Sequence, residues 1–199
     1  MEREDRPILV ALSIWILLAI VFARARWFGH ASAPVVALTV WILTALVLLA
    51  WWKLPAVRAW ANDLPLPALI GLHLTRFVGF YFLFLCKDGA MPEAFALPAG
   101  IGDVVVAIGA VALLAVPQLR QSRPIVLAWN ALGLMDIVFV VFSALRLGLH
   151  DWGSMAPLRE LPLSLLPTFL VPLIITSHVL IFVRMRKRQE KVASRGVLN

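Results

Sequence analysis

Apolar stretches recur along this chain with only short breaks between them, and this pattern limits the fold more than any other feature. A stretch of roughly 20 apolar residues is long enough to cross the hydrocarbon core of a bilayer as an α-helix. Of the 199 residues, 62% are hydrophobic and 15% are charged, whereas a soluble domain carries about 25% charged residues. The sequence therefore predicts an all-α integral membrane bundle rather than a soluble domain.

Prolines and glycines divide the apolar sequence into six predicted transmembrane helices. The predicted ranges are 8–28, 35–54, 66–86, 94–116, 125–149 and 161–183. Residues 1–186 form one predicted transmembrane domain, and residues 187–199 form a basic tail. The first apolar run is long enough to span, and acidic residues precede it, so we interpret it as a helix and not as a cleaved signal peptide.

The positive charges are distributed unevenly between the two sides of the predicted bundle. The two termini and the second and fourth connections contain 12 Lys and Arg residues, whereas the first, third and fifth connections contain 4. The side with more positive charge usually faces the cytoplasm, which predicts that both termini are cytoplasmic. The net charge of +7 is thereby explained as a topology signal. We expect membrane lipid as a partner and no nucleic acid.

Small residues on the third predicted helix indicate a close helix contact. Gly71, Thr75 and Gly79 recur every fourth residue, which lets another helix approach that face. We therefore expect this helix at the centre of the bundle. Trp15 and Trp41 lie deeper in their helices than the other tryptophans and are predicted to pack between helices.

The last predicted helix contains three prolines, Pro162, Pro167 and Pro172. Each removes a backbone donor and releases the carbonyl four residues earlier, so a bent helix is expected. Such a helix either lines a cavity or is a static kink whose carbonyls are satisfied by neighbours.

Polar residues inside the predicted spans are the candidate functional residues, because a charged side chain at mid-membrane costs about 2.5–3.5 kcal/mol. At a rise of about 1.5 Å per residue, Arg76, Asp103 and Asp136 all fall near the middle of the bilayer. A second set falls closer to the cytoplasmic side. It contains His73, Asn130 and His178. The sequence thus predicts two stacked polar layers supplied by four helices.

The charges of the first layer do not balance. One explanation is purely structural: Arg76 pairs with one or both aspartates and fixes the helix packing. One arginine does not neutralise Asp103 and Asp136 together, however, so a bound proton or cation is expected as well. A carboxyl group that binds a proton at mid-membrane is typical of proton-coupled transport.

Two further functions remain as alternatives. Gly100-Ile101-Gly102-Asp103 matches the GxGD motif of intramembrane aspartyl proteases, with Asp136 as the possible second carboxylate. The chain departs from that family because GxGD precedes the other aspartate and because Met135 stands where a tyrosine often precedes the partner. The protease hypothesis is the only one that makes this chain an enzyme.

The two histidines of the second polar layer provide the second alternative, a b-type haem redox protein. His73 and His178 fall at similar depth, as the axial ligands of a b-type haem would. No cofactor and no metal site is otherwise predicted, and the single cysteine, Cys86, excludes an intrachain disulfide.

The C-terminal half resembles a family of uncharacterised small bacterial membrane proteins. The resemblance rests on three segments: Phe95 to Asp103, Trp129-Asn130 through Asp136, and Leu161 to Phe169 with His178. It implies a multi-pass protein of the bacterial inner membrane and supplies no activity.

The leading hypothesis from the sequence is binding or proton-coupled translocation of a small solute or ion. Asp103 and Asp136 would be the protonatable groups and Arg76 their counter-charge. The second layer would form a polar path to the cytoplasm. Six helices make a thin wall around such a path, so a homodimer is plausible.

Overall fold

The computed structural model describes residues 6–196, which form helices and short connections without any strand. Within these residues six helical segments are long and apolar enough to cross a membrane, which confirms the predicted helical membrane class. They span Arg6–Arg24, Ala33–Lys53, Leu66–Lys87, Glu93–Ala115, Arg123–His150 and Leu166–Arg186.

Four of the six spans are continuous α-helices, and two are not. The continuous ones are α1 (Arg6–Arg24), α2 (Ala33–Lys53), α6 (Glu93–Ala115) and α8 (Arg123–His150). The third span joins α4 (Leu66–Gly71), the 3₁₀-helix η2 (Leu72–Val78) and α5 (Gly79–Lys87). The last span joins the π-helical segment η4 (Leu166–Leu170) to α9 (Val171–Gly196). The irregular turns in these two spans carry or adjoin the polar residues described below.

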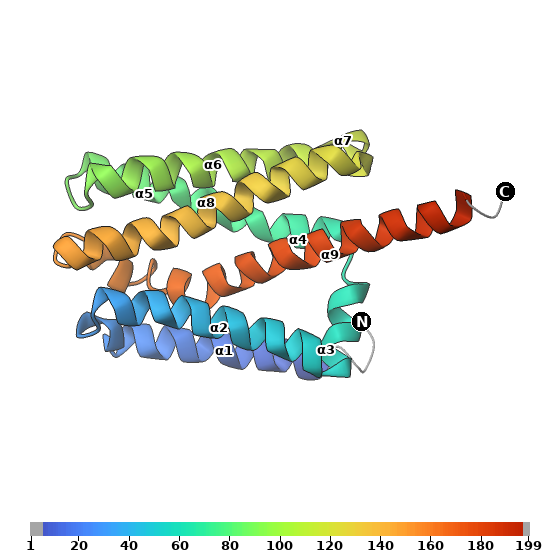
Figure 1. Cartoon of the computed structure of the whole chain (residues 1–199). Coiled ribbons are helices and arrows are strands. Elements are labelled where there is room, and N and C mark those ends of the chain that lie inside the picture. The colour runs from blue at the N-terminus through green and yellow to red at the C-terminus, as the bar shows by residue number, and fades with distance from the viewer. Residues whose placement is uncertain (1–5, 197–199) are drawn as a thin grey trace.

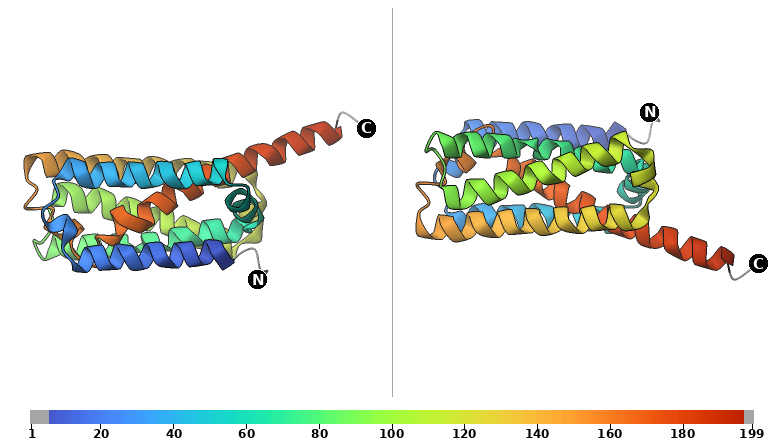
Figure 2. Two further views of the ribbon diagram at one scale, coloured as in Figure 1. Left: turned by 90° about the horizontal axis from the view of Figure 1, so that it is seen from below. Right: turned by 90° about the horizontal axis from the view of Figure 1, so that it is seen from above.

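Short helices occupy several connections that the sequence marked only as breaks. They are η1 (Trp27–Gly29), α3 (Pro55–Asp63), α7 (Pro117–Gln121) and η3 (Ala156–Arg159). Helices α3 and α7 both begin with proline, which is tolerated at the first position because the helix does not use that amide. Helix α3 lies across the end of the bundle (Figures 1 and 2).

Helix α9 runs between two layers of helices. Figure 1 shows α1 and α2 side by side on one flank and α5, α6 and α8 on the other. The span that contains α9 buries a larger share of its residues than any of the other five. The expectation that the third span lies at the centre was therefore wrong, and the proline-bearing last span occupies that place.

The predicted small-residue contact is formed at one of its positions. A Cβ atom on Gly79 would overlap the carbonyl oxygen of Gly100, and a Cβ on Gly100 would lie 2.8 Å from the carbonyl oxygen of Gly79. Backbone therefore meets backbone where α5 crosses α6. Gly71 has no neighbour within 4 Å of its Cβ position, and Thr75 is exposed.

The prolines of the last span shorten it relative to the prediction. The predicted helix began at residue 161, but residues 161–164 form a turn, and the described helix begins near Leu166. Pro172 leaves the carbonyl of Thr168 without its helical donor. The indole Nε1 of Trp15, on α1, donates to that carbonyl oxygen at 2.9 Å. Trp15 thus packs between helices, as expected, and also supplies the hydrogen-bond donor that the Thr168 carbonyl lacks at the kink.

The Arg6 end of α1 and the C-terminal end of α9 lie at the same end of the bundle (Figures 1 and 2). Arginines at this end bind free carbonyl oxygens of helix termini. Arg120 donates to Leu113 and Leu114 of α6 at 3.1 and 3.0 Å. Arg184 donates to three carbonyl oxygens at the end of α3, those of Ala61, Asn62 and Leu64. The cytoplasmic orientation of this end stays a prediction.

Candidate functional site

Arg76 connects three helices in the middle of the bundle. It lies on η2 and is 1% exposed. Its Nε donates to Oδ1 of Asp103 on α6 at 2.7 Å, and its Nη1 donates to the carbonyl oxygen of Gly133 on α8 at 2.9 Å. Its Nη2 pairs with Oδ2 of Asp136, also on α8. All three nitrogens of the guanidinium are thereby bonded, and both predicted aspartates share one cation.

The two aspartates differ in their access to the surroundings. The side chain of Asp103 is 4% exposed, whereas that of Asp136 is 17% exposed. Asp136 reaches Arg76 by passing over Gly102, where any Cβ atom would collide with its carboxylate oxygen Oδ1. A side chain at position 102 would fill the space that the Asp136 carboxylate occupies, so the carboxylate would have to move away.

The second polar layer is a hydrogen-bonded histidine cluster. His178 Nδ1 donates to Oδ1 of Asn130 at 2.8 Å, and Nδ2 of Asn130 donates to the His178 carbonyl oxygen at 3.0 Å. The Ser177 hydroxyl donates to the carbonyl oxygen of Ile174 at 2.8 Å, which leaves its oxygen to accept from His73 Nε2 at 3.1 Å. Both imidazoles are completely buried, and their ring centroids lie 4.3 Å apart.

Gly133 joins the two polar layers. Its carbonyl oxygen accepts from Arg76, and its Cα lies against the ring of His178, because a Cβ there would be 2.6 Å from Cε1 and 3.1 Å from Nε2. Neither Nε2 of His178 nor Nδ1 of His73 has a hydrogen-bond partner among the described residues. Because Nδ1 of His178 and Nε2 of His73 carry the protons, these two nitrogens are hydrogen-bond acceptors.

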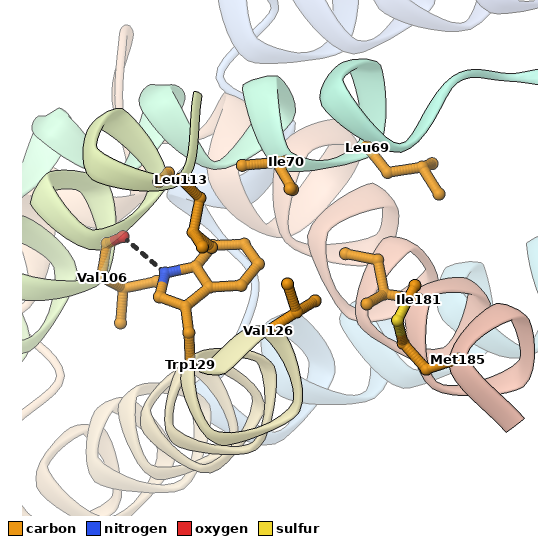
Figure 3. Packing of buried hydrophobic residues seen from close by; sticks show 9 residues of the cluster. Leu69, Ile70, Val106, Leu113, Val126, Trp129, Ile181 and Met185 are labelled. Atoms are coloured by element: carbon orange, nitrogen blue, oxygen red, sulfur yellow. Dashed lines mark hydrogen bonds between the residues drawn. The ribbon is translucent and has the colours of Figure 1, made fainter. Parts of the chain in front are cut away.

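Apolar side chains close the polar layers toward both ends of the bundle. Figure 3 shows the cluster toward the end where the chain termini lie, where Trp129 donates its Nε1 to the Val106 carbonyl oxygen at 3.0 Å. Buried around it are Leu69, Ile70, Ala110, Leu113, Val126, Ile181 and Met185. The opposite end is closed by a second cluster. It contains Phe82, Met91, Phe95, Ala96, Ala99, Val140, Met155, Leu158 and Leu163.

A groove between α6 and α8 reaches the ion pair from the side. It is lined by Gly102, Val105, Val106, Leu132, Met135, Asp136 and Phe139. Several of these side chains are exposed on the bundle surface, including Met135 and Val105. A separate cavity of about 20 Å³ adjoins Arg76 and Asp103, which is room for one water molecule. Asp136 is therefore the charged group of this cluster that opens toward the surface of the bundle.

The haem alternative does not fit this geometry. The porphyrin of a bis-histidine haem lies between the two axial imidazoles. Here the rings of His73 and His178 contact each other, and Trp129 packs 5.0 Å from the His73 ring. No space for a macrocycle exists between them.

The protease alternative also finds no support in the contacts. Asp103 and Asp136 each accept from a different nitrogen of the Arg76 guanidinium, and no hydrogen bond joins the two carboxyl groups in the described part of the chain, whereas the two carboxyl groups of a protease dyad share one proton. Gly100 and Gly102 have packing roles, since one meets Gly79 and the other makes room for Asp136. The GxGD string is thereby explained by helix contacts.

All six candidate residues from the sequence come together in these two contacting layers, although their roles stay predictions. Sequence reasoning missed Ser177, Gly102 and Gly133. Ser177 stands next to His178 in a polar string, Thr176-Ser177-His178, which was a usable signal. Gly102 was noticed only as part of the GxGD string, and Gly133 only in the segment that precedes Asp136, because their packing roles depend on which side chain crosses them.

Comparison with known protein families finds a match over most of the chain. Residues 33–186 match a family described as a domain of unknown function, DUF8737. No curated protein and no solved structure matches this chain at a significant level. The matched region starts at α2 and contains both polar layers, so the chain belongs to the DUF8737 family.

Proposed function

We propose that this protein couples proton binding at Asp136 to the translocation of a small ion or solute across the membrane. The observation that supports this is the unbalanced charge: the buried carboxylate of Asp103 and the partly buried carboxylate of Asp136 face one guanidinium, which leaves one negative charge near the middle of the bundle. Burying an uncompensated charge is costly, so a proton or a cation completes the cluster. Asp136 is the group that exchanges, because it is the more exposed carboxylate.

The other polar residues have distinct roles in this proposal. Arg76 holds Asp103 as a permanent partner and releases or attracts Asp136 as its charge changes. The layer of His73, Asn130 and His178 extends the polar region toward the end where the termini lie, which we place in the cytoplasm of a bacterial inner membrane.

Translocation requires the bundle to open, because apolar clusters close both ends. Arg76 and His73 lie on the 3₁₀-helix η2, and Leu166 of the π-helical segment η4 lines the same small cavity as Arg76. Mid-helix turns of this kind often mark hinges, and discontinuous helices carry the binding sites of many transporters. A change of charge at Asp136 would act directly on η2 through Arg76.

A hydrophobic carbodiimide tests the exchanging group, since it reacts with protonated carboxyl groups within the membrane. We expect labelling of Asp136 in the purified protein, faster at lower pH, with the site located by mass spectrometry of peptides. Asp136→Asn should abolish the labelling, whereas Asp88→Asn, in an exposed connection, should leave it unchanged. Labelling that is absent at every pH would contradict the proposal.

A structural role for the charges is the second candidate, and the complete bonding of the Arg76 guanidinium favours it. This role predicts that Asp136→Asn lowers the thermal stability as much as Asp103→Asn does. The proposal predicts a smaller loss for Asp136→Asn, because Asp136 is the more exposed partner and the more buried pair, Arg76 with Asp103, stays intact. Unfolding midpoints of the two variants in one mild detergent separate the two roles.

A further inference from the structure

We propose that the groove between α6 and α8 admits a lipophilic cation from the bilayer, which binds the carboxylate of Asp136 in competition with a proton. This inference rests on the proposed function and names the class of its substrate. The groove lies beside Asp136 and is lined by Gly102, Val105, Val106, Leu132, Met135, Asp136 and Phe139.

The direction of access follows from how the ion pair is enclosed. One apolar cluster closes it toward the chain termini, and another closes it toward the opposite end. A third cluster, with Val40 of α2 and Ile174 of α9, covers the flank that faces those helices. The groove between α6 and α8 is left as the side on which Asp136 approaches the surface. A ligand that reaches Asp136 therefore comes from the hydrocarbon region.

The lining of the groove defines the body of the ligand. Leu132, Met135 and Phe139 lie on α8, and Val105 faces them from α6. All four side chains are exposed to the surroundings of the bundle. Methionine adapts to irregular apolar shapes, and the ring face of phenylalanine attracts cations. An apolar body fits here, whereas a hydrated inorganic ion would lose its water shell without replacement.

The charge of the cluster defines the charge of the ligand. Arg76, Asp103 and Asp136 together carry one excess negative charge, and a monovalent cation neutralises it. Oδ2 of Asp136 accepts from Arg76, while its Oδ1 makes no hydrogen bond to any residue in the described part of the chain. In a medium of low dielectric constant the attraction between the carboxylate and a cation is far stronger than in water. A proton on Asp136 removes this attraction, so one site holds either a proton or the cation.

Tetraphenylphosphonium and tetraphenylborate provide a matched pair of probes, because they have nearly the same shape and opposite charge. Binding of each to the purified full-length protein in mild detergent would be measured by titration calorimetry. We expect the phosphonium to bind. Its affinity should fall as the pH is lowered, by up to about tenfold for each pH unit once Asp136 is mostly protonated. Asp136→Asn should weaken this binding by about tenfold or more, which corresponds to about 1.4 kcal/mol. Asp88→Asn should have no effect.

Val105→Trp tests the groove without changing any charge, and it should weaken phosphonium binding because it fills the space beside Asp136. Equal binding of the two probes, or unchanged binding in Asp136→Asn, would overturn the inference and indicate an apolar occupant such as a lipid chain. A disulfide between two chains of a Met135→Cys, Cys86→Ser variant, with no probe binding, would also overturn it and assign the groove to a second copy.

The carbodiimide experiment separates the two levels of the proposal. Labelling of Asp136 without phosphonium binding contradicts the lipophilic cation and leaves proton exchange standing. Absence of labelling together with absence of binding contradicts both. Protection of Asp136 from the carbodiimide by the phosphonium, but not by the borate, would support both.

Discussion

At the scale of single residues, the site is built as much by glycines as by charges. Gly133 offers its carbonyl oxygen to Arg76 and its bare Cα to the ring of His178. Gly102 leaves the space that the Asp136 carboxylate fills. A charged residue in a membrane helix needs a partner at close range. Here the glycines have no side chain, which leaves room for the charged groups to reach their partners.

Gly102→Ala should disrupt the pairing of Asp136 with Arg76. The added methyl group would occupy the place of Oδ1, and such overpacking costs about 1–3 kcal/mol. We expect a lower unfolding midpoint, followed by tryptophan fluorescence in mild detergent. Gly71→Ala is the matched control, because no atom lies within 4 Å of its Cβ position. Equal midpoints for the two variants would show that Asp136 does not depend on this space.

The sequence predicted which charged and polar residues meet, because depth in a bilayer can be counted along each helix. Arg76, Asp103 and Asp136 fall at one depth by that count and are bonded in the structure. The count does not give the rotation of each helix. It therefore did not show that Asp136 is the more exposed aspartate, or that the His73 and His178 rings touch.

At the scale of elements, the last span is the most enclosed, and it is one of the two spans that are not continuous α-helices. Proline at position 172 frees the Thr168 carbonyl, and the donor that satisfies it comes from α1, more than a hundred residues away in the chain. Prolines in the sequence indicated a bend, but not that the helix begins only near Leu166 or that a π-helical turn precedes α9. These details depend on neighbours that a local pattern does not contain.

Trp15→Phe should loosen the contact between α1 and η4. It leaves the Thr168 carbonyl oxygen without its donor, and an unsatisfied buried acceptor costs about 1–3 kcal/mol. We expect faster hydrogen exchange in peptides that cover residues 166–175, measured by mass spectrometry. Trp52→Phe, at an exposed position on α2, is the control. Unchanged exchange in Trp15→Phe would mean that water or lipid replaces the indole.

At the scale of the whole molecule, hydropathy and proline punctuation were sufficient to predict six spans, because a bilayer requires long apolar helices. They did not predict α3 and α7, since a short helix at a membrane surface has no required length or apolar run. The order of helices in space was also not predicted, and the third span was wrongly expected at the centre. Helices that are apolar on all sides do not show in their sequence which neighbour each side contacts.

The predicted orientation can be tested by thiol labelling of intact cells in a Cys86→Ser background. Gln121 lies in the connection between α6 and α8, with Arg120 and Arg123, and His30 lies in the connection between α1 and α2, at the opposite end of the bundle. Each is replaced by cysteine in a separate variant. The excess of positive charge predicts that a membrane-impermeant maleimide labels His30→Cys and not Gln121→Cys. The reverse pattern would place the chain termini outside the cytoplasm.

The bonds of Arg76 also set an order for biogenesis. Translation delivers the arginine first, then Asp103, and Asp136 last. A nascent chain that ends after the third span exposes a lone cation to the insertion machinery, and the next span to be synthesised neutralises it. The fifth span then brings the surplus negative charge. The residues of the neutral pair, Arg76 and Asp103, are thus both synthesised before Asp136, the group proposed to exchange protons.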